Sequence, residues 1–320
     1  MEVNIDLLKE FEESIDTINP EQGKIPIKIL GYGEISLVFE IVNDPSYLAY
    51  KRIPIFDNEK QVKRHIWAFN RYNKILKDDI GINLPAQSTI WFKDKNDKIQ
   101  FYITQEKVNS EAVGNHIIHN ISDQEVELLV LLVMREMKKV WTYNKSNNNM
   151  DVGLDGQISN FVVIDYNPDN PKIDPNSRLL YLDTSTPMFR RNGIEAMEAE
   201  LFLKSAPSFL RFLLKALFLQ EVLDRYYDWR LVTIDLIANF FKEQKSEIVP
   251  KLIQRVNKFF EEEADSFAIE PITLTEVEKY YKNDKTIWVV FQRARKIDRF
   301  LKTKVFRKNY DYYLPGKIER

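Results

Sequence analysis

The sequence predicts an α+β protein with two lobes, a small antiparallel β-sheet lobe followed by a larger, mostly helical lobe. Residues 25–108 contain runs rich in β-branched and aromatic residues, including SLVFEIVN and IQFYITQEKV, with turn signals between them. After residue 122 apolar residues recur at helical spacing, and the stretch Ser122–Glu125 is typical of a helix-starting capping box. These two patterns, in this order, define the fold class.

Three units follow from the same patterns. Residues 1–24 are expected to form an N-terminal helical extension, because MEVNIDLLKEFEESID is acidic and amphipathic. The β-rich lobe is expected over 25–108, with one helix near 57–77 between its strands. The helical lobe is expected over 109–320, with a short strand pair embedded at about 155–183 in QISNFVVID and SRLLYLD.

Composition excludes several classes of protein. The chain has 320 residues, of which 44% are hydrophobic and 29% are charged, as in ordinary globular proteins. It has no cysteine, which excludes disulfides, thiol nucleophiles and Cys-ligated zinc. The apolar runs are too short or too charged to span a bilayer, and the N-terminus lacks the features of a signal peptide. We therefore expect a cytoplasmic protein without membrane contact.

A glycine-containing loop is the first candidate functional element. Residues 31–36 read GYGEIS, which nearly matches the G-x-G-x-x-G pattern of phosphate-binding loops. In a dinucleotide-binding fold such a loop leads into a helix, whereas here the strand-like SLVFEIVN follows it. The GKS or GKT of a P-loop is also absent. The remaining interpretations are a β-hairpin folded over phosphates and an ordinary hairpin turn whose glycines adopt positive φ.

Chemistry-bearing residues follow the loop in a definite order. Lys51 lies on the next predicted strand, in Ala49-Tyr50-Lys51. Asp155 and Asn160 are five residues apart in DGQISN, and Asp183 ends the strand LLYLD. A glycine loop, a strand lysine, an Asp–Asn pair and a second Asp are the parts that position a nucleotide triphosphate and its metal ion in kinases.

Taken together, these motifs resemble the protein-kinase-like superfamily, in style closest to its aminoglycoside and choline phosphotransferase branch, as a divergent prokaryotic subgroup. The resemblance covers roughly residues 25–190 and implies a protein-kinase-like fold that binds ATP and Mg²⁺ between the lobes. It implies that Asp155 orients the acceptor hydroxyl and that Asn160 and Asp183 bind the metal ion. The histidine that usually precedes the catalytic Asp by two residues is Gly153 here.

The nucleotide itself is implied to contact the first lobe. Lys51 would pair with the α- and β-phosphates and thereby take part in catalysis. Backbone groups of the hinge would bind the adenine edge. The implied nucleotide-binding residues are Gly31, Gly33, Ser36, Val38, Lys51, Glu106 and Val108.

One departure concerns the partner of Lys51, which in this superfamily is a helix glutamate. In the segment NEKQVKRHIWAFNRYNKIL the only acid is Glu59, at its start. Asn70 or His65 could take its place, or the pair could be missing. Arg52, next to Lys51, is expected on a solvated face of the sheet.

The leading functional hypothesis is an ATP- and Mg²⁺-dependent phosphotransferase acting on a small-molecule hydroxyl rather than on a protein. The alternatives are a pseudokinase that binds nucleotide or an unidentified protein partner, a nucleotidyltransferase on the same fold, and a nucleic-acid-binding module. The last would use the basic stretch 293–320, but the net charge of −2 argues against a nucleic-acid partner. The polar group YYDWR at 226–230, with Asp235 and Asn239, is either a buried network or part of an acceptor pocket.

Overall fold

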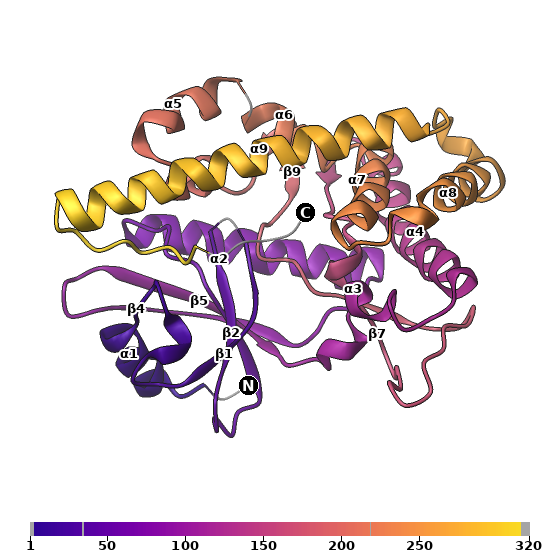
Figure 1. Cartoon of the computed structure of the whole chain (residues 1–320). Coiled ribbons are helices and arrows are strands. Elements are labelled where there is room, and N and C mark those ends of the chain that lie inside the picture. Colours follow the sequence, from indigo (N-terminus) through magenta and orange to yellow (C-terminus); the bar gives the residue numbers. More distant parts are fainter. Residues whose placement is uncertain (1–2, 34, 218, 315–320) are drawn as a thin grey trace.

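A five-stranded antiparallel sheet forms the N-terminal part of the protein (Figure 1). The computed structural model describes residues 3–33, 35–217 and 219–314. The strands lie in the order β1-β2-β3-β5-β4, so the strand that carries Lys51 is in the centre. Their bounds are β1 Ile27–Tyr32, β2 Leu37–Ile41, β3 Leu48–Arg52, β4 Gln87–Lys93 and β5 Ile99–Glu106.

Two helices cover the opposite faces of this sheet. Helix α1 (Ile5–Ser14) packs Phe11 against Phe39 and Tyr102, whereas helix α2 (Glu59–Lys74) packs Phe69 against Phe101. Successive side chains of a strand point to opposite faces, so Phe101 and Tyr102 of β5 serve different cores. This is why strand β5 is apolar on both sides and reads as a continuous hydrophobic run.

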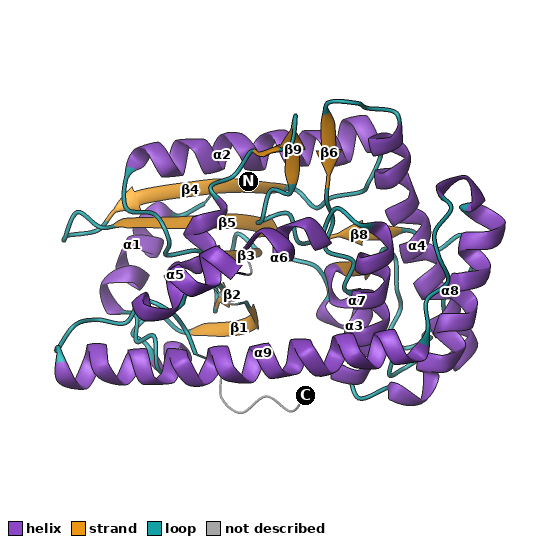
Figure 2. Cartoon of the chain, turned by 90° about the horizontal axis from the view of Figure 1, so that it is seen from above, coloured by secondary structure: helices purple, strands orange, loops and turns teal. Residues whose placement is uncertain are grey.

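The rest of the chain is mostly helical and contains short strands (Figure 2). The mixed α+β class, with an antiparallel sheet followed by a helical region, is therefore confirmed. The helices are α3 Gly114–Ile117, α4 Asp123–Lys145, α5 Ser208–Leu217, α6 Leu219–Arg225, α7 Trp229–Lys242, α8 Val249–Glu263 and α9 Leu274–Phe300. The strands are β6 Met150–Val152, β7 Phe161–Val163, β8 Leu179–Tyr181, β9 Phe189–Arg191 and β10 Ile194–Glu195.

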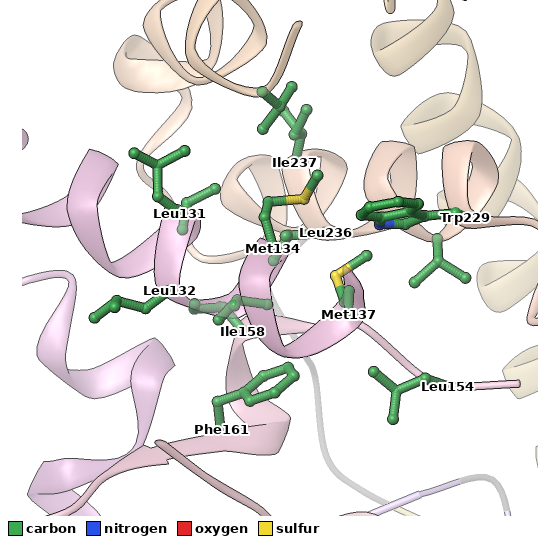
Figure 3. Close-up of a cluster of buried hydrophobic side chains, with 14 of the residues drawn as sticks. Leu131, Leu132, Met134, Met137, Leu154, Ile158, Phe161, Trp229, Leu236 and Ile237 are labelled. Atoms are coloured by element: carbon green, nitrogen blue, oxygen red, sulfur yellow. The ribbon is translucent and has the colours of Figure 1, made fainter. Parts of the chain in front are cut away.

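Helix α4 is the centre of the helical core. Its capping box is formed as the sequence predicts, with the Ser122 and Glu125 side chains each bonded to the other's backbone. The run 129–134 is buried on every side because α7 packs on one face and the β7 region on another. Figure 3 shows Met134 and Met137 of α4 between Trp229 of α7 and Phe161 of β7. Among the described residues no helix is long and apolar enough to cross a bilayer.

The embedded strand pair is present, and β7 pairs antiparallel with β8 through Phe161 and Tyr181. Residues 194–207 lie in the part of the chain that we expected to be mostly helical, but they contain no regular α-helix. Residues 194–207 form β10 and a 3₁₀ stretch, Ala199–Ser205, which places Leu201 in the core beneath α2. Besides this leucine, hydrogen bonds from Arg64 to the Ala196 carbonyl and from Lys204 to the Ile55 carbonyl attach the segment to the N-terminal part.

Arg52 contradicts the expectation of a solvated side chain, since only 5% of it is exposed. It lies beneath α1, where its Nε and Nη2 donate to the two carboxylate oxygens of Glu12 at 2.6 and 3.0 Å. The Tyr102 hydroxyl also donates to Glu12, and Arg52 Nη1 donates to the carbonyl of Asp311 at 2.7 Å. Burial lowers the pKa of Arg52, but the adjacent Glu12 carboxylate more than offsets this and the net shift is upward.

Replacing Glu12 with Gln should lower the free energy of unfolding by about 3–5 kcal/mol, because Arg52 would remain buried without a counter-charge. Denaturant unfolding at neutral pH measures this loss. Glu10→Gln is the matched control on the same helix, since Glu10 pairs with Lys24 at the surface and its loss should be small. Equal losses in the two variants would contradict the assigned role of the buried pair.

Candidate functional site

The glycine loop is a β-hairpin turn between β1 and β2. Gly33 donates its N–H to the Ser36 carbonyl at 3.0 Å, and Tyr32 pairs with Leu37. Neither Gly31 nor Gly33 has a positive φ, so a left-handed backbone is not the reason for glycine at these two positions. A Cβ added at Gly31 would meet no atom within 4 Å. A Cβ added at Gly33 would lie 3.1 Å from Ser36 Oγ, so the open space is at Gly31. Open space above a glycine is compatible with a phosphate-binding loop.

Lys51 of β3 contacts the segment that follows β8. Its ammonium donates to Asp183 Oδ1 at 2.9 Å and to the Ser185 hydroxyl. The Ser185 hydroxyl in turn donates to Asp183 Oδ1 at 2.7 Å. The pair remains accessible, with 22% of the Lys51 side chain and 31% of the Asp183 side chain exposed. The structure thus brings together two predicted site residues that are far apart in the sequence.

The electrostatics of Asp183 keep it ionised. Burial raises the pKa of the Asp183 carboxyl, but the Lys51 ammonium and the Ser185 hydroxyl lower it by more, so the net shift is downward. An ionised carboxylate is the form that binds Mg²⁺.

Helix α2 does not supply the partner of Lys51. Glu59 pairs instead with Lys93 at 3.3 Å, and Asn70 is exposed. His65 is buried among aromatic rings, with its ring centre 5.1 Å from that of Phe56. Neither suggested substitute therefore contacts Lys51, whose contacts come from Asp183 and Ser185.

Asp155 and Asn160 lie in the loop between β6 and β7. The Asn160 side-chain amide donates to the Asp155 carbonyl at 3.3 Å, and the Asn160 carbonyl accepts the N–H of Leu182 next to Asp183. Gly153 is anchored by helix α2, because the Tyr72 hydroxyl donates to its carbonyl at 2.8 Å. Tyr72 thus attaches the start of the Asp155 loop to helix α2.

Asp155 has an unusual pKa. Burial, followed by the nearby carboxylates of Asp235 and Asp183, raises the pKa of Asp155 to about 7. A carboxyl that titrates near neutrality is suited to accept a proton from a reacting hydroxyl. Asp155 and Asp183 are therefore two neighbouring carboxyl groups whose pKa values their surroundings move in opposite directions.

The predicted metal ligands at this site are one carboxylate, from Asp183, and one side-chain amide, from Asn160. Within the part of the chain that the structure describes, no group of three or more His, Cys, Asp or Glu residues could hold a metal ion by itself. This donor set fits Mg²⁺, which is usually held by one or two carboxylates together with substrate phosphates.

The predicted hinge residues lie apart from this cluster. Strand β5 ends at Glu106, whose side chain is exposed, and Val108 follows it half-buried. The Lys107 N–H donates to the Tyr47 carbonyl, which fixes the strand end against the start of β3. No hydrogen bond between described residues joins Glu106 or Val108 to Lys51 or Asp183. Their predicted adenine contact stays a prediction.

A pocket of about 90 Å³ is lined by Gln157 and Asp235. Gln157, two residues after Asp155, donates to Asp235 Oδ2 at 3.3 Å, and the Tyr280 hydroxyl of α9 donates to Asp235 Oδ1 at 3.0 Å. Asp235 is thus part of a buried hydrogen-bond network and also lines the pocket. The residues around it combine aromatic rings with both signs of charge, and they include Arg225, Tyr226, Asn239, Lys242, Tyr281, Asp284 and Trp288.

Sequence reasoning missed Ser185 and Tyr72. Ser185 stands in the triplet Asp183-Thr184-Ser185, and a hydroxyl two residues after a predicted metal-binding Asp could have suggested a contact with it. Tyr72 carried no such signal, because an aromatic residue on the buried face of a helix is usually only part of the core.

Comparison with known proteins assigns the family. Residues 10–299 match the family described as "Family of unknown function (DUF6206)". The chain belongs to this family. No curated protein matches the chain by sequence.

Solved structures give distant likenesses. The chain is similar to "WaaP in complex with acyl carrier protein", with 12% identity and a TM-score of 0.32 over 64% of this chain and 90% of that one. It is also similar to the GDP complex of wild-type aminoglycoside 2'-phosphotransferase-IIIa, with 9% identity and a TM-score of 0.30 over 73% and 92% of the two chains. A point mutant of that enzyme matches with 11% identity at the same TM-score, over 74% and 93%. TM-scores of this size do not assign a fold, so the proposals below rest on the chain's own residues.

The buried imidazole of α2 gives a pH prediction. Burial lowers the pKa of His65 to about 4, below its ordinary value of 6.5, so the unfolded chain binds the proton more tightly. Stability should therefore be lost as the pH falls from about 6.5 to 4, by about 3 kcal/mol in total. His65→Phe removes this titration. Denaturant unfolding of both proteins at pH 7 and pH 4 measures the difference, and parallel pH dependences would contradict it.

Proposed function

We propose that this protein is an ATP- and Mg²⁺-dependent phosphotransferase with a two-lobed, protein-kinase-like fold, and that its acceptor is a small-molecule hydroxyl. The observation that carries the proposal is the contact of Lys51 and Ser185 with Asp183, beside the loop of Asp155 and Asn160. These side chains come from separate segments and meet where the sheet adjoins the helical part. An accessible lysine beside an aspartate whose pKa is lowered, with a second aspartate nearby whose pKa is raised, is a combination that clusters at functional sites.

Each residue has a defined role in this reaction. The open backbone at Gly31, together with the neighbouring Gly33, would accommodate the phosphates, and Lys51 would pair with the α- and β-phosphates. Asp183 and Asn160 would hold Mg²⁺, which supplies neutralisation of phosphate charge. Lys51 would then exchange its contact with Asp183 for one with phosphate oxygens, and Asp183 would be available to the metal ion.

Asp155 would act on the acceptor. Its carboxylate accepts a hydrogen bond from the acceptor hydroxyl and takes the proton as the new oxygen–phosphorus bond forms. The bond between the γ-phosphorus and the bridging oxygen breaks, and ADP is the leaving group. Catalysis is then mainly positioning and charge stabilisation.

The pocket lined by Gln157 and Asp235 supports a small polar acceptor, since the Asp235 carboxylate is close enough to Asp155 to raise its pKa. Its walls combine the rings of Tyr226, Tyr280 and Trp288 with the amide of Gln157 and the carboxylate of Asp235. Aromatic faces beside fixed polar groups suit a compact molecule that carries several hydroxyl groups. A peptide would need a longer groove than a pocket of about 90 Å³.

A pseudokinase is the second candidate, and one observation favours it. Among the described residues, no carboxylate of α2 contacts Lys51, and the ammonium is held by Asp183 and Ser185 instead. A protein of this kind would bind nucleotide, or only a partner, without transferring phosphate.

Nucleotide binding should appear as thermal stabilisation. ATP with Mg²⁺ at about a hundred times its dissociation constant should add roughly 2.7 kcal/mol and raise the melting temperature by a few degrees. Asp183→Asn should lose the Mg²⁺-dependent part of the shift. The control Asp169→Asn, on an exposed loop, should keep it. If no nucleotide shifts the wild-type melting temperature, the proposal fails.

Transfer itself depends on Asp155. Asp155→Asn should bind ATP like the wild type but transfer phosphate roughly 10²–10⁴ times more slowly, because the carboxylate that accepts the hydroxyl proton is gone. Wild type and variant are incubated with ATP, Mg²⁺ and a panel of sugars, polyols and amino alcohols, and ADP release is measured. Equal rates would refute the role of Asp155. ATP binding without transfer to any acceptor would favour the pseudokinase, and pyrophosphate release would indicate nucleotidyl transfer.

A further inference from the structure

Helix α9 carries the chain from the helical part back to the sheet (Figure 1). It packs on α7 and then extends past the sheet, which both views show (Figure 2). Just beyond the helix the chain reverses. Arg307 adopts a left-handed φ of 51°, and the Lys308 N–H donates to the Lys302 carbonyl at 2.8 Å. Residues 308–314, here called the return segment, then run back between α9 and the sheet. Residues 315–320 of the basic stretch lie outside the described residues.

The return segment is held from three directions. Arg52 of β3 donates to the Asp311 carbonyl at 2.7 Å, and Thr17 donates to the Tyr310 carbonyl at 2.6 Å. From α9, Arg295 donates to the Tyr313 carbonyl at 3.2 Å. The donors therefore come from the sheet, from the chain after α1 and from α9. Contacts of this kind fix the backbone of the segment.

The segment also touches the glycine loop. The ring of Tyr313 lies 5.9 Å from the ring of Tyr32, measured between ring centres. Ile35, Ser36 and Leu37 of the hairpin line a cavity of about 10 Å³ together with residues 311–313. A cavity of this size holds about one water molecule, so the return segment packs almost directly on the loop.

We propose that the return segment positions the glycine loop, with Tyr313 as the positioning residue, and thereby sets the affinity for nucleotide. The effect on nucleotide affinity rests on the proposed function, whereas the positioning of the loop does not. The Tyr32 ring of the hairpin lies against Tyr313, and Ile35 to Leu37 share the small cavity with residues 311–313, so the return segment is placed to hold the hairpin. Ordering the loop before the nucleotide arrives removes an entropic cost from binding.

The experiment compares Tyr313→Ala, Tyr32→Ala, the double variant and Tyr313→Phe. Calorimetry with ATP and Mg²⁺, well below the melting temperature of each variant, gives the dissociation constant. An aromatic pair of this kind predicts a loss of roughly two- to tenfold for each alanine variant. The double variant should bind no more weakly than the weaker binding single variant, because the two single substitutions remove the same ring contact. Tyr313→Phe keeps the ring and should bind like the wild type.

A second readout needs no nucleotide. Hydrogen exchange of the backbone amides at 31–38 should be faster in Tyr313→Ala than in the wild type, with no change in the β4–β5 hairpin. Tyr313→Phe should again match the wild type.

Unchanged exchange at 31–38 in Tyr313→Ala would overturn the positioning role whatever the nucleotide data show. Additive losses in the two single variants would overturn the contact as its cause. If the wild type binds no ATP, the proposed function and the link to affinity fail, while faster exchange would still establish the positioning of the loop.

Discussion

The buried ion pair of Arg52 and Glu12 is the interaction on which the N-terminal part of the protein depends. Arg52 carries a permanent charge at a position with almost no contact with water, so every group around it must compensate that charge. Glu12 supplies the counter-charge from α1, and the Asp311 carbonyl supplies an acceptor from the other end of the chain. A strand residue therefore joins two distant parts of the sequence to the same side of the sheet.

Lys51 is the residue before Arg52 in strand β3, and its side chain points to the opposite face of the sheet. The alternation along β3 separates a structural cation from one with a proposed function, since Arg52 faces α1 and Lys51 faces Asp183. The position of Lys51 relative to Asp183 thus depends on the strand being held by the Arg52 network behind it. A shift of β3 by one residue would turn Arg52 to the face of Asp183 and Lys51 to the face of α1, so both contacts depend on the same strand register.

Much of the fold could be predicted, because its signals are local. Strand runs, the capping box at Ser122 and the pairing of β7 with β8 follow from patterns within short windows. The order of Lys51, Asp155, Asn160 and Asp183 predicted a common site, and the structure places Lys51 beside Asp183. What failed was long-range. The burial of Arg52 depends on Glu12 and Asp311, and no pattern around residue 52 indicates partners at such separations. Ser185 and Tyr72 were missed for the same reason, since their roles exist only once distant segments meet.

The hydrogen bond from Tyr72 to the Gly153 carbonyl has a consequence for the motion of helix α2. It fastens helix α2 to the loop of Asp155, and the donor is a buried side chain in the helical core. Swinging or rotating this helix would leave a polar group unsatisfied in an apolar interior, which is costly. Helix α2 and the loop of Asp155 are therefore expected to move together, since separating them costs about 1–3 kcal/mol.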